Sequence, residues 1–228
     1  VSAYVLYAAD LWGADVRPYF VDTPFQPRFE LADAQRLCGE LGAALQVLPV
    51  DILSVPHVAE NPPDRCYHCK RAIFSAIAAA AERDGYPLLL DGTNASDPEE
   101  DRPGMRALRE LEVRSPLREC GLTKDEIRRL SREAGLFTWD KPAYACLATR
   151  VPPGTAIGRR DLERTEQAED YLARLGFRDF RVRLLDGCAR IQVPAAQLSL
   201  ALERRGEIFS ELRQFYRGVL LDLEARNE

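Results

Sequence analysis

The sequence predicts an α/β protein with a doubly wound parallel sheet, followed by a smaller α+β part. Helix and strand patterns alternate from the start of the chain to "YPLLLDG" (86–92), the order that gives a parallel sheet covered by helices. The run 86–92 is continuously apolar before its Asp-Gly end, as in a strand buried on both faces. From about residue 157 the order changes, so we place two domains at 1–155 and 156–228.

Each element has its own local signal. In the first part we expect helices at 1–13, 28–42, 64–84 and 122–136 and strands at 15–22, 43–51 and 86–92. Gly13 and Gly42 are natural helix ends, and Thr123 with Glu126 three residues on forms a capping box. In the second part we expect helices at 160–175 and 195–214, a hairpin within 177–194 and a strand at 218–224.

Composition excludes several classes of partner. The 228 residues are 46% hydrophobic and 29% charged, which is ordinary for globular domains. A net charge of −5 does not favour a broad grip on nucleic acid. No apolar run approaches the ~18 residues of a membrane helix, and no secretory signal opens the chain. Six irregularly spaced cysteines are expected to be reduced, which predicts a cytoplasmic protein. From the charge and the lack of a long apolar run we predict neither nucleic-acid nor membrane partners.

Ligands of doubly wound sheets bind beyond the carboxyl ends of the strands. Asp22 lies at one such end, in "VDTPF", and "DGTNASD" (91–97) follows another. Gly92 permits close approach of a backbone, and Thr93 and Asn94 supply donors for a nucleotide. We therefore predict a nucleotide site at this edge.

An acidic stretch continues from that loop. Asp97 could bind Mg²⁺, a hard ion that prefers oxygen ligands. Arg102, in "RPG", is a candidate cation beside the nucleotide.

The motif "RCYHCK" (65–70) places Cys66 and Cys69 one helical turn apart. They share a helix face near its N-terminus, where the thiolate is favoured. No second pair of ligands follows at zinc-finger spacing. Incidental thiols, a zinc knuckle, a redox dithiol and part of an iron–sulfur site all remain open readings.

Cys146 lies in a Pro- and Gly-rich stretch without periodicity (137–158), between Lys141 and Arg150. Nearby cations stabilise a thiolate, and long irregular loops are often functional. A buried, inert thiol is the alternative. With Cys66 and Cys69, this cysteine could complete a cluster site with one open iron.

Arg181 and Arg183 are two residues apart in an expected strand, so they share one face. Paired guanidinium groups can bind a phosphate. A solvated strand face is the equally weighted alternative.

These motifs also occur in a characteristic order. "RCYHCK", "LLLDGTNASD", "DRPGMRAL", "VRSPL", the stretch from "GLTKDEIRRLSREAGL" to "FTWDKPAYACLATRVPPGT", and "GFRDFRVR" together resemble the LarE family. These proteins are ATP-dependent sulfur transferases of the PP-loop pyrophosphatase superfamily. The resemblance implies a Rossmann-like, HUP-type PP-loop ATPase domain, followed by a domain for substrate binding and homo-oligomerisation.

The resemblance also implies a reaction. It uses ATP and Mg²⁺ to adenylate a carboxylate of a pyridinium dicarboxylate mononucleotide, which sulfur converts to a thiocarboxylate for the nickel-pincer nucleotide of lactate racemase. In some members a single loop cysteine gives up its own sulfur. In others, three cysteines hold a [4Fe–4S] cluster that delivers sulfide. The pair in "RCYHCK" favours the cluster type, with Cys66, Cys69 and Cys146 as ligands.

Other residues take roles by the same resemblance. Ser2 matches the last serine of the SGGxxS phosphate loop. The remaining assignments place Lys70, Arg102, Thr149 and Arg150 near the reacting centre and Arg181 and Arg183 on the substrate phosphate. Two alternatives remain: a PP-loop tRNA thiolation enzyme, and a zinc-knuckle interaction protein without catalysis.

Overall fold

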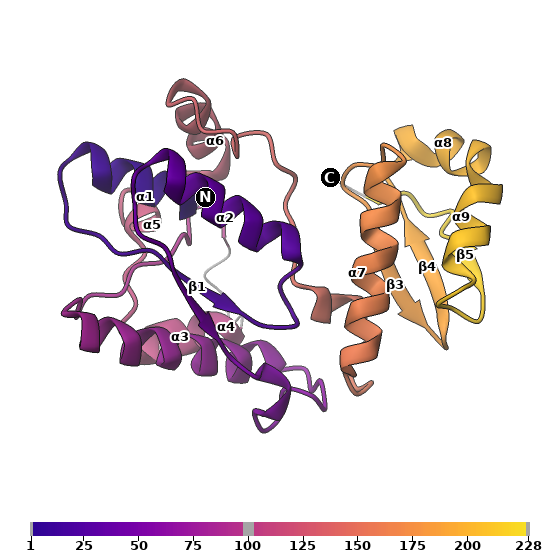
Figure 1. The fold of residues 1–228 in the computed structure, drawn as a ribbon, viewed down its shortest axis with the longest axis horizontal. Coiled ribbons are helices and arrows are strands. Elements are labelled where there is room, and N and C mark those ends of the chain that lie inside the picture. Colours follow the sequence, from indigo (N-terminus) through magenta and orange to yellow (C-terminus); the bar gives the residue numbers. More distant parts are fainter. Residues whose placement is uncertain (1, 98–102, 227–228) are drawn as a thin grey trace. The chain divides into compact units, whose positions relative to one another are not determined.

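The computed structural model describes residues 2–97 and 103–226, which fall into two compact units. The first unit contains the described residues up to 58 and those from 63 to 141; the second contains 59–62 and the residues from 142 onward. The division after Lys141 differs from the boundary expected at 155, because the short helix Leu147–Arg150 packs against the helix Arg159–Arg174 and the strand Arg181–Leu185. Residues 59–62 join the same unit through backbone hydrogen bonds of Ala59 and Asn61 with Ile157 and Gly154. Figure 1 shows the course of the chain.

The first unit has a parallel pair of strands with helices around it. Its strands are β1 (Tyr19–Asp22) and β2 (Gln46–Pro49), and its helices are α1 (Ser2–Leu11), α2 (Arg28–Glu40), α3 (Arg65–Asp84), α4 (Pro103–Glu110), α5 (Pro116–Glu119) and α6 (Lys124–Glu133), with the short 3-10 helix η1 (Ile52–Ser54). The two strands pair in parallel from Tyr19 opposite Gln46 to Asp22 opposite Pro49. Their carboxyl ends therefore lie side by side.

Local signals in the sequence explain how the long helices begin and end. Helix α3 ends at Gly85, whose φ of 85° is the left-handed conformation that glycine adopts without strain. Helix α6 starts with the predicted capping box: the Thr123 side chain accepts from the Glu126 N–H, and the Glu126 carboxylate accepts from the Thr123 N–H. Helices α3 and α4 pack together, and their buried small residues include Ala80, Ala81 and Ala107.

The segment 86–92 corrects one expectation. It was predicted to be a strand buried on both faces, but only an isolated parallel bridge joins Leu90 to Arg114. Leu88 is 58% exposed and Leu90 is 38% exposed. The reason is that the described residues pair this backbone on one side alone, through hydrogen bonds with Arg114. The described chain is thus a mixed α/β structure with a parallel pair of strands.

The second unit is an α+β fold around a three-stranded sheet. Its elements are η2 (Leu147–Arg150), α7 (Arg159–Arg174), β3 (Arg181–Leu185), β4 (Cys188–Gln192), η3 (Ala195–Gln197), α8 (Leu198–Glu203), α9 (Arg205–Leu212) and β5 (Val219–Leu221). The predicted hairpin is confirmed: β3 and β4 are antiparallel, joined at Asp186 and Gly187, whose φ values of 46° and 78° suit a tight hairpin turn. Strand β5 pairs in parallel with β4.

The core of the second unit lies between α7 and the sheet. Leu162, Ala168 and Leu172 on α7 are buried, as are Val182 on β3 and Ile191 on β4. Helix α7 packs against both β3 and η2, so it supports the loop in which Cys146 lies. The single helix expected at 195–214 is divided into η3, α8 and α9.

Within the described part of the chain, no helix combines the length and the apolar character needed to cross a membrane.

Candidate functional site

The predicted nucleotide loop lies against the start of α1. A β-carbon built on Gly92 would be 2.5 Å from Ser2 Oγ and 2.9 Å from the Ser2 nitrogen, distances that real β-carbons do not show. The close approach that Gly92 was predicted to permit is therefore used by Ser2. The structure thus brings together Ser2 and Gly92, two of the residues expected at the nucleotide, although they lie far apart in the sequence.

Hydrogen bonds within the loop fix its shape. The Asp91 carboxylate accepts from the Thr93 N–H at 3.1 Å, from Thr93 Oγ1 at 2.5 Å and from Ser115 Oγ at 2.7 Å. The Asp97 Oδ2 atom accepts from the backbone N–H of Asn94 at 3.0 Å and from its side-chain amide at 2.8 Å. Thr93 and Asn94 are both buried. Their side chains order the loop, and Asp97 retains acceptor capacity on its carboxylate.

Asp22 takes the position expected from topology, at the carboxyl end of β1. Its carbonyl oxygen accepts from the Val50 N–H at 3.0 Å, just beyond β2. Thr23 follows and is buried, and its hydroxyl accepts from the Phe25 N–H at 3.1 Å. Arg102 lies outside the described residues.

The cysteine pair occupies the first turns of α3, as predicted. Cys66 is exposed and Cys69 is half-buried. Both histidines of the chain lie here: the rings of His57 and His68 have centroids 5.1 Å apart, and His68 Nε2 is 3.3 Å from Asp64 Oδ2. The sequence placed His68 at the pair but gave no signal for His57, which precedes α3 in a turn with a φ of 64°.

Lys70 extends from α3 across α4. A β-carbon on Gly104 would lie 3.0 Å from Lys70 Cδ and 3.6 Å from its Nζ. The glycine therefore leaves room for the lysine side chain against α4.

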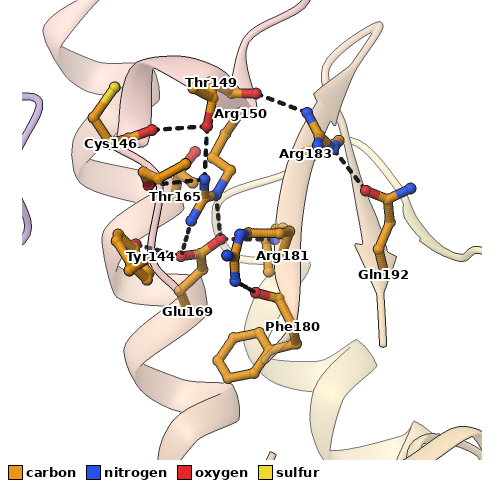
Figure 2. Close-up of polar contacts among 12 residues, drawn as sticks. Tyr144, Cys146, Thr149, Arg150, Thr165, Glu169, Phe180, Arg181, Arg183 and Gln192 are labelled. Carbon is orange, nitrogen blue, oxygen red and sulfur yellow. Dashed lines mark hydrogen bonds and ion pairs between the residues drawn. The ribbon is translucent and has the colours of Figure 1, made fainter. Parts of the chain in front are cut away.

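The cysteine loop, defined as residues 143–150, is held by arginine side chains and by Thr149 (Figure 2). Arg181 donates to the Ala143 carbonyl, and Arg150 Nη1 donates to the Ala145 carbonyl at 3.1 Å. Thr149 Oγ1 donates to the Cys146 carbonyl at 2.8 Å, and Arg183 Nη1 donates to the Thr149 carbonyl at 2.8 Å. Figure 2 shows the Cys146 side chain pointing away from the Arg150 guanidinium. The loop thus presents a half-buried thiol on a fixed backbone.

Glu169 on α7 is the centre of these contacts, and sequence reasoning missed it. Glu169 is 5% exposed, and its carboxylate pairs with Arg150, with Nε–Oε1 at 2.7 Å and Nη2–Oε2 at 3.1 Å. It also accepts from the Tyr144 hydroxyl and, at 2.9 Å, from the Val182 N–H. A signal existed, because Glu169 occupies a core position in the apolar stripe of α7, between Thr165 and Leu172.

Arg150 is 1% exposed, and the contacts of its guanidinium are all with protein groups of the second unit. Burial opposes its charged form, but hydrogen bonds to Glu169 and the Glu169 charge raise the pKa of Arg150. Its place in the structure is therefore to hold the cysteine loop, and contact with a reacting group stays a prediction.

Arg181 and Arg183 share one face of β3 but are not a solvated pair. Arg181 is buried, and Arg183 is half-buried with its Nε donating to Gln192 Oε1 at 2.6 Å. Burial lowers the pKa of both guanidinium groups, and the neighbouring charges of Arg150 and Arg226 lower it further. The solvated-face alternative is wrong for Arg181. Positive charge concentrated in this way favours an anion nearby, as phosphate binding requires.

The predicted metal ligands are divided between the units. Cys66, Cys69 and Asp97 belong to the first unit and Cys146 to the second. Among residues 2–97 and 103–226, no group of three or more His, Cys, Asp or Glu side chains is placed to hold a metal ion. The three-cysteine cluster and the Mg²⁺ site stay predictions.

Fold and site together define a class: a two-part α/β protein with a polar loop against the start of its first helix and a cysteine presented on an arginine-held loop. Comparison with known proteins identifies the family within that class. The pyridinium-3,5-bisthiocarboxylic acid mononucleotide synthase of Lactiplantibacillus plantarum is 34% identical over 205 residues, which cover 90% of this chain and 72% of that protein. The chain therefore belongs to the family of this synthase, the LarE family.

Two further relatives carry no functional name. An uncharacterized protein of Synechocystis is 37% identical over 198 residues, 86% of this chain and 74% of that protein. An uncharacterized protein of Methanocaldococcus jannaschii is 29% identical over 206 residues, 90% of this chain and 79% of that protein. No family model matches the chain.

Proposed function

We propose that this protein is an ATP-dependent sulfur transferase that makes a thiocarboxylate from a carboxylate of a pyridinium dicarboxylate mononucleotide. The product would serve the nickel-pincer nucleotide of lactate racemase. The observation that carries the proposal is the match to a pyridinium-3,5-bisthiocarboxylic acid mononucleotide synthase over 90% of this chain. The cysteine loop, with its half-buried thiol, supports the same chemistry.

The reaction needs two steps because the carboxylate oxygen is a poor leaving group. A carboxylate oxygen leaves poorly, so the carboxylate first attacks the α-phosphorus of ATP, giving an acyl-adenylate and pyrophosphate. A sulfur nucleophile then attacks the acyl carbon, and AMP leaves with the former carboxylate oxygen. The thiocarboxylate therefore gains one sulfur and loses one oxygen. A thiolate or sulfide suits this step because it is nucleophilic near neutral pH.

Residues of the first unit would bind the nucleotide. Ser2 begins α1 against Gly92, and helix N-termini with their free N–H groups suit phosphate. Asp97 has acceptor capacity for the Mg²⁺ that accompanies ATP, because its carboxylate receives hydrogen bonds on one oxygen only in the described contacts. Lys70 would supply a mobile cation near the transferred group.

Residues of the second unit would bind the substrate phosphate and orient the sulfur. Arg181 and Arg183 would contact the phosphate, and Arg183 also holds the Thr149 carbonyl. Arg150 and Thr149 would keep the backbone around Cys146 in place. The nucleophile would then meet the acyl carbon without a search over loop conformations.

The donor set also fits a [4Fe–4S] cluster. Cys66, Cys69 and Cys146 are soft thiol ligands of the kind that iron–sulfur clusters use, and Arg65 Nη2 lies 3.5 Å from Cys66 Sγ. A cluster held by three cysteines would supply sulfide from its open iron. The alternative source is the sulfur of Cys146 itself. We expect the protein to act as a homo-oligomer.

The test uses full-length protein with MgATP, sulfide and the pyridinium dicarboxylate mononucleotide. AMP and pyrophosphate should form only when the substrate is present, and its mass should rise by the difference between sulfur and oxygen. Cys146→Ser should abolish the mass change but still release pyrophosphate, because adenylation precedes the attack of sulfur. Cys188→Ser, in the same unit, is the matched control and should keep both. Formation of ADP and phosphate instead would contradict the proposal.

A further inference from the structure

Glu169 connects three parts of the second unit through one buried carboxylate. Its backbone belongs to α7, Oε1 accepts from the Val182 N–H of β3, and Oε2 accepts from Tyr144 at the start of the cysteine loop. Both oxygens also bind Arg150 at the end of that loop. The carboxylate therefore fixes the loop at residues 144 and 150, on both sides of Cys146.

Arg150 carries this restraint to the residues next to the thiol. While two of its nitrogens bind Glu169, Nη1 donates to the Ala145 carbonyl at 3.1 Å and to Thr149 Oγ1 at 2.7 Å. The Thr149 hydroxyl then donates to the Cys146 carbonyl. Figure 2 shows this path from carboxylate to guanidinium to hydroxyl to the cysteine backbone.

The charges around Glu169 make it difficult to replace. Arg150 binds Glu169 directly, and Arg181, which is also buried and pairs with Asp179 at 3.5 Å, lies nearby (Figure 2). Without Glu169, Arg150 would be a buried cation with no counter-charge among its described contacts, next to other cations. Breaking a buried ion pair by removing one partner is strongly destabilising. The loop would then open, because opening lets Arg150 reach water.

We propose that Glu169 is a positioning residue for sulfur transfer, holding the cysteine loop through Arg150 and Tyr144 so that thiolation stays coupled to adenylation. This inference rests on the proposed function for its catalytic consequence. Its structural part, control of the Cys146 thiol, stands on the contacts alone.

The first measurement follows alkylation of each cysteine by iodoacetamide, read by mass spectrometry, in full-length wild type, Glu169→Gln and Asp170→Asn. Glutamine keeps the size of the side chain but removes its charge. Asp170 is the exposed neighbour on α7, so Asp170→Asn removes one carboxylate without touching the loop. Cys146 should react about tenfold faster or more in Glu169→Gln, given the cost of an unpaired buried charge. It should react as in wild type in Asp170→Asn.

Two other cysteines separate loop opening from unfolding. Cys38 is buried in the first unit, and Cys188 is half-buried on β4 in the second. Their rates should not change in Glu169→Gln. An unchanged Cys146 rate, or a rise shared equally by Cys188, would overturn the proposal. If Glu169→Gln does not fold, Tyr144→Phe tests the proposal instead. It removes the hydrogen bond between Tyr144 and Glu169 but keeps the ion pair with Arg150, so Cys146 should react faster than in wild type by a smaller factor.

The second measurement is the ratio of pyrophosphate released to thiocarboxylate formed. In Glu169→Gln this ratio should rise, because adenylation continues while sulfur transfer fails, and the apparent KM for the mononucleotide should change less than the rate of thiolation. A merely structural defect would lower both products together and overturn the positioning role. If wild type releases no pyrophosphate at all, the proposed function fails, and the alkylation rates still decide the role of Glu169.

Discussion

Ser2 and Gly92 touch across the first unit: a β-carbon on residue 92 would lie 2.9 Å from the Ser2 nitrogen and 3.1 Å from its α-carbon. The neighbours in this contact are backbone atoms at the start of α1, which cannot rotate away as a flexible side chain would. The contact joins the helix end to the loop that carries Thr93 and Asn94. Glycine is therefore required at this position for steric reasons.

Replacing Gly92 by alanine should destabilise the first unit by about 1–3 kcal/mol, the usual cost of overpacking against atoms that cannot move. Thermal or urea unfolding would measure it. Gly39→Ala is the matched control, because that glycine lies within α2 with nothing near its missing β-carbon. The control should be stabilised by roughly 0.5–1 kcal/mol, since alanine favours a helix. Equal stability of both variants would contradict the close contact.

Replacing Arg183 by alanine should weaken binding of the mononucleotide substrate by roughly 1.5–3 kcal/mol, the scale of charge-assisted hydrogen bonds. Titration calorimetry would measure the affinity. Arg190 is the control, because it lies opposite Arg183 on β4 and is paired with Asp222; Arg190→Ala should bind nearly as wild type does. Should Arg181→Ala and Arg183→Ala both bind substrate normally, these arginines hold the loop and nothing else.

Local patterns predicted the elements whose signals lie within a few residues. The hairpin within 177–194 and the Thr123 capping box appear in the structure as expected, because a hairpin or a cap depends on residues close together in sequence. The prediction of a buried strand at 86–92 was wrong for a related reason. Apolar composition says that a strand can be buried, whereas Leu88 and Leu90 are buried only if other segments cover them.

In the candidate site, too, the sequence identified residues but not the contacts between distant parts of the chain. Composition and order pointed to Cys146, Arg181 and Arg183, yet they could not say what each guanidinium contacts. Glu169 lies in the stretch 160–175, which was predicted only to be a helix, and its role comes from Arg150, 19 residues away in sequence. A carboxylate at a core position of a helix is the one local signal that could have found it.

The stability of the second unit should fall at alkaline pH. Burial raises the pKa of Tyr216 from 10 to about 12. The unfolded chain therefore loses the tyrosine proton before the folded chain does, and the stabilising contribution, complete below pH 10, is lost as pH rises toward 12. Between about pH 9 and 11 the loss is roughly 1 kcal/mol from this residue. Burial and, after it, the charge of Glu169 also raise the pKa of Tyr144. This second tyrosine therefore also lowers the stability of the folded unit as pH rises.

Urea unfolding across that range would check the prediction. Tyr216→Phe should be less stable than wild type at the lower pH, because it loses the contact with Thr165, but its stability should depend less on pH. Tyr171→Phe, at a half-exposed position on α7, should follow the wild-type curve. A Tyr216→Phe curve parallel to that of wild type would show that this hydroxyl does not titrate as its burial predicts.

The source of sulfur is the last prediction, and it separates the two mechanisms of the family. With a cluster on Cys66, Cys69 and Cys146, anaerobic reconstitution should give about four irons per chain. Each single Cys→Ser variant of these three should lose the iron, because two thiolates retain a cubane poorly, while Cys38→Ser, at a buried site, should keep it. Repeated turnover should then leave the mass of the Cys146 peptide unchanged. If the iron-free protein instead thiolates its substrate once and the Cys146 peptide becomes lighter by one H₂S, the cluster mechanism is wrong and the cysteine gives up its own sulfur.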